Sequence, residues 1–229
     1  ADPMTDDNVV LVGVDGSPES LAAVDWAVAR AECQGWRVHI LCAYSLPSFT
    51  TASLDGGYAA LDDSAIRSGA QAVIDEAVER VKKAGVTVTS SLETGDPAGV
   101  LVDLSEEAAL AVVGTRGGGG FADRLLGTVS SALPAHSHCP AVVVPRHNEG
   151  ADYTPVRRIV VGVDGSSSAR RALKWAVTEA EAWGAELTAI AAVPMASGAG
   201  ALAWLPAAVD REQVLADVRS GLDRAINEA

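Results

Sequence analysis

Apolar and polar residues follow two kinds of pattern along this chain. Uncharged apolar runs, such as 9–14 and 109–113, are typical of strands buried on both faces of a sheet. Elsewhere apolar residues recur every three or four positions, which predicts amphipathic helices. In chain order the predicted strands are 9–14, 38–43, 86–92, 109–113 and 141–144, and the predicted helices are 18–34, 63–83, 97–107 and 128–135. This alternation predicts a doubly wound α/β domain with a five-stranded, mainly parallel sheet.

Helix boundaries are marked by particular residues. Ser17 suits the N-cap of the first helix and Pro18 its first position, while Gly35 is a natural stop. Asp96 is the expected cap of the helix that begins at Pro97. We expect residues 45–61, rich in Ser, Gly and Thr, to form a long loop.

A repeat divides the chain. Residues 9–44 and 158–193 align without gaps at an offset of 149 and share VGVDGS, which indicates two tandem copies of one unit. We therefore predict a complete domain at 4–147, a linker at 148–157 and a partial second domain at 158–229, with residues 1–3 interpreted as a cloning scar. The second copy has strands at 159–163 and 186–193 and helices at 169–183 and 213–227, without a glycine-rich loop.

The net charge restricts the classes of binding partner, and the cysteine content indicates the cellular compartment. A net charge of −13 argues against nucleic acid and against an anionic membrane surface. Three widely spaced cysteines without a C-x-x-C pair suit reduced thiols, and hence a cytoplasmic location. The uncharged stretch 187–209 contains prolines and glycines and falls on a strand and loop of the second copy, so we expect no membrane span.

The sequence VGTRGGGGF at 113–121 follows a predicted buried strand directly. Glycines let main-chain N–H groups close around an anion, and the N-terminus of the helix beginning near Thr128 favours negative charge. Ligands of open α/β sheets sit at the carboxyl ends of strands. If the first and fourth strands are neighbours, Asp15 and this loop face one crevice, with phosphate as the expected occupant. The alternative is a surface loop without a ligand, and Asp15 could serve only as a turn cap.

The spacing is more specific than the glycine run. Neither a Walker A motif nor a dinucleotide-binding G-x-G-x-x-G is present. Gly114-x2-Gly117-x9-Gly127-Thr128, followed by Ser130, resembles the motif of the ATP-binding universal stress proteins, and VGVDGS is similar to that family's first strand and turn. The resemblance covers 9–145 and, as a shortened second copy, 158–228.

The resemblance implies a set of nucleotide-binding residues. Asp15 would contact ribose or adenine, Gly13 would lie beside the nucleotide, and Ala43 would lie near the adenine edge. Ribose and phosphates would be held by Gly114, Thr115, Arg116, Gly117, Gly118, Gly119, Gly120, Gly127, Thr128, Val129 and Ser130. The implied ligand is ATP, with or without Mg²⁺, and family members commonly pair through their last strands, here 141–144. Asp164 repeats Asp15, but without the loop we expect no complete second site.

These observations predict an ATP-binding stress-response regulator with no catalytic residue and no metal ligand. Two alternatives remain open. A slow ATPase would use the same site, although the loop offers no lysine and no second acid. An interaction scaffold would leave the crevice without nucleotide.

Overall fold

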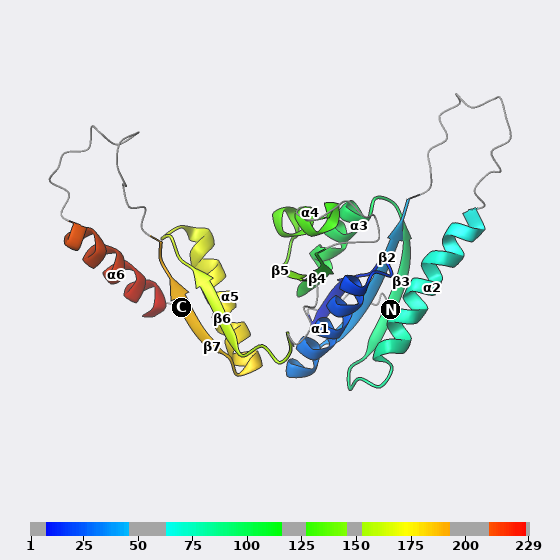
Figure 1. Cartoon of the computed structure of the whole chain (residues 1–229), viewed down its shortest axis with the longest axis horizontal. Coiled ribbons are helices and arrows are strands. Elements are labelled where there is room, and N and C mark those ends of the chain that lie inside the picture. The colour runs from blue at the N-terminus through cyan, green and yellow to red at the C-terminus, as the bar shows by residue number, and fades with distance from the viewer. Residues whose placement is uncertain (1–7, 46–62, 116–126, 146–152, 193–210, 228–229) are drawn as a thin grey trace, which may run out of the picture. The chain divides into compact units, whose positions relative to one another are not determined.

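The computed structural model describes residues 8–45, 63–115, 127–145, 153–192 and 211–227 (Figure 1). It divides the chain into two compact units, Ala1–Thr154 and Pro155–Ala229. The long loop expected at 45–61 lies outside the described residues apart from Ser45. The predicted domain boundaries, with a first domain at 4–147, a linker at 148–157 and a second domain at 158–229, stay predictions.

The first unit is built on one five-stranded sheet in the order β3-β2-β1-β4-β5. All four neighbouring pairs are parallel, which confirms the predicted fold class. The pairing of β1 with β4 confirms that the first and fourth strands are neighbours, so their carboxyl ends meet where the winding reverses. The strands are β1 (Val9–Gly13), β2 (Arg37–Tyr44), β3 (Val88–Thr94), β4 (Leu110–Gly114) and β5 (Ala141–Val144).

The helices of this unit begin and end close to the positions predicted. They are α1 (Pro18–Gln34), α2 (Asp63–Val81), α3 (Pro97–Leu104) and α4 (Thr128–His136). Ser17 caps α1 and Asp96 caps α3, as predicted, and Gly35 ends α1 with a left-handed φ of 67°. The predicted helix 97–107 is wrong at its end, because α3 stops at Leu104 and a short 3₁₀ turn, η1 (Ser105–Glu107), follows. There the Ser105 hydroxyl donates to the Val102 carbonyl at 2.6 Å.

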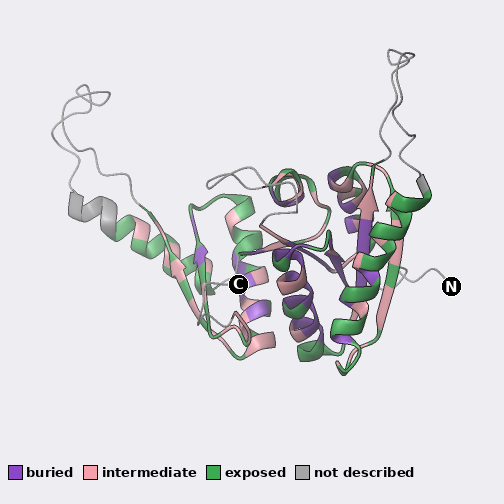
Figure 2. Ribbon diagram, turned by 45° about the vertical axis from the view of Figure 1, so that its right-hand side comes forward, coloured by how far each residue is buried: buried purple, intermediate pink, exposed green. Residues whose placement is uncertain are grey.

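Helices cover both faces of the sheet, and the most buried residues lie on the central strands (Figures 1 and 2). On one face Leu11 and Leu41 cluster with Leu101 of α3 and Leu133 of α4. Each of these four side chains is at most 4% exposed. Burying one Leu contributes about 1.5–3 kcal/mol, so this cluster fixes α3 and α4 on the sheet and sets where the loop between β4 and α4 must start and end.

The second unit repeats the first two strands and helices of the first. It contains β6 (Arg158–Gly162), α5 (Ser167–Trp183), β7 (Glu186–Ile190) and α6 (Arg211–Asn227), with β6 and β7 parallel. The predicted strand 186–193 is too long, since β7 ends at Ile190. Val161, Val163, Leu173 and Ala176 form its core.

The other face of β6 and β7 is exposed among the described residues. Val160 is 63% and Ile190 51% exposed, whereas the residues that the repeat aligns with them, Leu11 and Leu41, are buried. Within the described parts of the chain, no helix is long and apolar enough to cross a membrane.

Candidate functional site

Asp15 occupies the tight turn between β1 and α1. Its Oδ1 accepts hydrogen bonds from the Ser17 N–H at 3.0 Å and the Ser17 hydroxyl at 2.6 Å, while the Ser17 Oγ accepts from the Ser20 N–H at 3.1 Å. Gly16 has a φ of 80°, a conformation that favours glycine. The carboxylate of Asp15 therefore stabilises the turn, in agreement with the prediction from the sequence that Asp15 could serve as a turn cap. The Asp15 side chain is also exposed, at the carboxyl end of the sheet.

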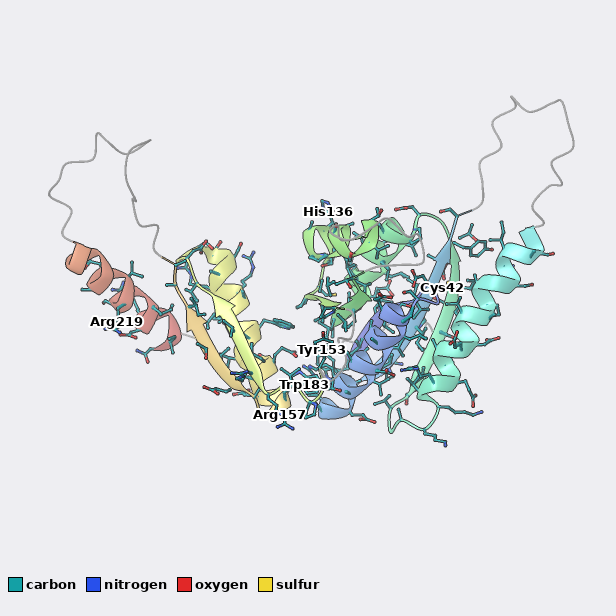
Figure 3. All side chains as sticks on the ribbon, viewed as in Figure 1. Cys42, His136, Tyr153, Arg157, Trp183 and Arg219 are labelled. Carbon is teal, nitrogen blue, oxygen red and sulfur yellow. The ribbon has the colours of Figure 1, made fainter. Side chains whose placement is uncertain are left out.

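Strand β2 runs past the end of β1 and lies beside Asp15. Gly13 pairs with Leu41, and the ladder continues for one bond, from the Val14 N–H to the Leu41 carbonyl at 2.8 Å. Because β2 continues to Tyr44, the half-buried Ala43 lies beyond the end of β1. Cys42, labelled on β2 in Figure 3, has a raised pKa, chiefly because the thiol is buried and also because of the negative charge of Asp15. The negative charge of Asp15 therefore acts on the end of β2.

Two predicted site glycines permit close packing inside the protein. A Cβ on Gly114 would lie 2.6 Å from the carbonyl carbon of Glu19, in the first turn of α1. A Cβ on Gly13 would lie 2.8 Å from Leu101 and 3.2 Å from Val113. The space beside both glycines is filled by protein, so any contact with a ligand would be made by their main chains and stays a prediction.

The two ends of the glycine-rich segment meet at Thr115. The Thr115 carbonyl accepts from the Gly127 N–H at 3.2 Å and from the Ser130 hydroxyl at 2.8 Å. On its other side the Thr115 N–H donates to the Val144 carbonyl at 3.0 Å, which joins this point to β5. Thr115 and Gly127, the described residues on either side of 116–126, are therefore hydrogen-bonded to each other beside the end of β5. We call the contacts among Thr115, Gly127 and Ser130 the loop neck.

Helix α4 starts at the loop neck without a side-chain cap. Its N-cap is Gly127, which makes no side-chain hydrogen bond, whereas Ser17, Asp96 and Ser166 cap α1, α3 and α5 with theirs. The first N–H groups of a helix have no partner within it, so they can bind an anion. Thr128 is exposed at the first position of α4. Val129 packs against the core cluster instead.

The structure brings together part of the predicted site. Asp15, Gly114, Thr115, Gly127 and Thr128 lie at or just beyond strand ends on the same edge of the sheet, since β1 and β4 are parallel neighbours. Arg116, Gly117, Gly118, Gly119 and Gly120 lie outside the described residues.

Sequence reasoning missed two neighbours of the site. Glu19 is 9% exposed and its main chain packs on Gly114, while Val144 holds Thr115 through its carbonyl. The only signal for Glu19 is its place in the first helical turn after VGVDGS. The role of Val144 depends on the register between β4 and β5, which cannot be predicted from the sequence.

The turn of Asp15 has a counterpart in the second unit. Asp164 Oδ1 accepts from the Ser166 N–H at 2.9 Å, and Gly165 has a φ of 82°. Hydrogen bonds from Ser166 lower the pKa of Asp164. The described residues of that unit contain no counterpart of the loop neck.

Comparison with known proteins identifies the family. The sequence model of the universal stress protein family matches residues 8–145 and 155–225. The chain belongs to this family. It is 32% identical over 222 residues to the universal stress protein Rv2623 of Mycobacterium tuberculosis, an alignment that covers 93% of this chain and 73% of the relative. It is 34% identical over 191 residues to Rv2005c of the same organism, with 79% of this chain and 62% of the relative covered.

Solved structures of universal stress proteins share the fold. A universal stress protein from Archaeoglobus fulgidus has a TM-score of 0.69 and 21% identity, and the match covers 97% of this chain and 75% of that one. Another was solved in complex with cAMP. It is 32% identical over 60% of this chain and 96% of its own, but its TM-score of 0.46 is too low for its ligand to be placed in this structure.

Proposed function

We propose that the first unit binds an adenine nucleotide, ATP, with or without Mg²⁺, and acts as a non-catalytic, nucleotide-dependent regulator of a stress response. One observation carries this proposal. In the motif Gly114-x2-Gly117-x9-Gly127-Thr128, the described ends are hydrogen-bonded to each other at the loop neck. The neck lies directly before the start of α4, which has no side-chain cap, and on the same edge of the sheet as the end of β1. Main-chain N–H groups and a helix N-terminus at one point favour a phosphate group.

Asp15 provides the polar group for the other end of the nucleotide. Its carboxylate is exposed at the end of β1, and a carboxylate accepts hydrogen bonds from the hydroxyls of a ribose. Because Ala43 lies beyond the end of β1, the main chain of β2 at this residue would be accessible for pairing with the edge of the adenine ring. The phosphates are then held far more by main-chain donors than by charged side chains, which suits a chain with a net charge of −13.

The central test places a negative charge where the phosphates are expected. Thr128→Glu adds a carboxylate at the exposed first position of α4, which stabilises a helix by about 0.3–1 kcal/mol. Ser167→Glu makes the same change at the first position of α5 and is the matched control. We expect isothermal titration calorimetry to show ATP binding by the wild type and Ser167→Glu, and at least a tenfold loss of affinity in Thr128→Glu. Equal affinity in all three proteins would contradict the proposal.

The companion variant Gly117→Val should also abolish the rise in melting temperature that ATP produces. Mass spectrometry of small molecules released from freshly purified protein asks directly which nucleotide is bound.

Steady phosphate release that Asp15→Ala abolishes without loss of binding would favour the alternative, a slow ATPase. The absence of any nucleotide and of any shift in melting would favour the interaction scaffold.

We also propose that two chains pair through β5. This strand pairs only with β4 in the described part of the sheet and is half-buried over Ala141–Val143, so its outer edge is open to a second strand. Val142→Lys should then leave the fold intact and give a monomer in analytical ultracentrifugation. Persistence of the dimer in this variant, or a monomeric wild type at tens of micromolar, would contradict the pairing.

A further inference from the structure

The hydroxyl of Ser130 is directed at the protein itself. Ser130 lies in the first turn of α4 and is 2% exposed. Its Oγ is 2.8 Å from the Thr115 carbonyl oxygen and 3.0 Å from the Gly127 carbonyl oxygen. A serine hydroxyl has one hydrogen to donate, and here both nearby acceptors belong to the main chain at the loop neck.

The Thr115 carbonyl is the centre of the neck. A carbonyl oxygen has two lone pairs, and that of Thr115 accepts one hydrogen bond from the Gly127 N–H and one from Ser130. The first bond is long, at 3.2 Å, and the second, at 2.8 Å, is of ordinary length for a hydroxyl donor. Ser130 thus supplies the shorter of the two bonds that join the ends of the glycine-rich segment.

We propose that Ser130 is a positioning residue of the nucleotide site, not a phosphate ligand. By holding Thr115 beside Gly127 it keeps the start of α4 at the end of β4, where the phosphates are expected. Thr128, which is exposed at the first position of α4, would then supply the hydroxyl that faces the phosphates. This inference rests on the proposed function, and it reassigns one of the residues that the family resemblance counts as a direct contact.

The two roles predict different behaviour before any nucleotide is added. A positioning hydroxyl stabilises the neck in the free protein, whereas a phosphate ligand acts only in the complex. Hydrogen exchange at the Gly127 amide, measured by NMR without nucleotide, reports the neck directly because this amide donates to Thr115. Titrations with ATP and with adenosine separate the phosphate part of binding from the rest.

The variants are Ser130→Ala and the control Ser131→Ala. Ser131 is the exposed neighbour of Ser130 on the same helical turn. For Ser130→Ala we expect Gly127 exchange to become about 3- to 10-fold faster and ATP affinity to fall by a similar factor, as for the loss of one hydrogen bond, with adenosine affinity within twofold of wild type. Ser131→Ala should match the wild type in all three measurements.

Two results would overturn the inference. Unchanged Gly127 exchange with weakened ATP binding would make Ser130 a direct ligand, and faster exchange with unchanged ATP affinity would make the neck irrelevant to binding. If the wild type bound neither ATP nor adenosine, the proposed function would fail, while the exchange experiment would still decide whether Ser130 holds the neck. Ser130→Cys, similar in size but a poor donor, repeats the test if the alanine variant does not fold, as judged by circular dichroism.

Discussion

The main chain of Glu19 occupies the space in which a side chain on Gly114 would lie. The last residue of β4 and the first turn of α1 are therefore in direct contact, with a distance of 2.6 Å from the Glu19 carbonyl carbon to a Cβ placed on Gly114. Asp15 precedes that turn and the glycine-rich segment follows Gly114, so this contact sets the distance between the two halves of the proposed site.

The first prediction concerns this contact. Gly114→Ala should lower the free energy of unfolding by about 1–3 kcal/mol, because main chain has to move to admit the methyl group. Gly69→Ala is the control, since Gly69 is exposed on α2 and a Cβ there would meet nothing within 4 Å. It should raise stability by about 0.5–1 kcal/mol. Urea unfolding of both variants checks the pair, and equal effects would contradict the packing.

A second prediction compares the two equivalent turns. Asp15→Asn should weaken ATP binding by about 10- to 100-fold, as expected for loss of hydrogen bonds to a charged group. Asp164→Asn removes the same charge from the second unit and should leave binding unchanged. The pKa of Cys42 should fall in Asp15→Asn alone, because the charge of Asp15 helps to raise it. Alkylation rates against pH measure that pKa in a background of Cys33→Ser and Cys139→Ala, in which Cys42 is the remaining thiol.

Ionic strength gives a third prediction. The chain carries a net charge of −13, so its overall field repels ATP. Raising salt screens this repulsion, and the Debye length is already about 10 Å at 0.1 M. We expect the Kd for ATP to fall, or to stay within about twofold, between 50 and 200 mM NaCl. A Kd that rises tenfold would indicate a strongly basic phosphate site instead.

Alkaline pH provides a fourth prediction. Burial raises the pKa of the Cys139 thiol from 9.0 to about 11 in the folded protein. Between these values the unfolded chain loses this proton and the folded chain keeps it, so unfolding becomes more favourable as pH rises. The stabilisation is fully present below pH 9 and is lost as pH rises through 11. In Cys139→Ala the fall in stability between pH 9 and 11 should be smaller, as denaturant titrations at each pH would show.

The fifth prediction concerns the two units. In the second, Val160 and Ile190 are exposed on a sheet face that is buried in the first. We expect this unit to unfold at a lower temperature, giving two transitions in calorimetry. ATP at about one hundred times its Kd should stabilise the first unit by about 2.7 kcal/mol and shift only the upper transition. One transition that ATP shifts as a whole would show that the units unfold together.

The sequence predicted most of the fold because its signals are local. The buried runs, the Ser17 and Asp96 caps and the Gly35 stop each specify a nearby backbone conformation, and the structure confirms them. The end of α3 was missed because the Ser105 hydroxyl binds a main-chain carbonyl there, and serine alone does not indicate which carbonyl it will find.

The candidate site was predictable only where the motif lies. Glycine spacing indicated the segment and its two ends. It did not show that Gly13 and Gly114 face Leu101 and Glu19, because such contacts depend on how helices pack on the sheet. Nor did the serine of the motif indicate that its hydroxyl would turn back to Thr115.

Thr115 takes part in two structures at once through its main chain. Its N–H is part of the ladder to Val144 on the outermost strand, and its carbonyl is part of the loop neck. A partner that docks along that outer strand and a small molecule seated at the start of α4 would therefore each act on a peptide plane that adjoins the Cα of Thr115. The two places are thus separated by no more than the φ and ψ angles of a single residue.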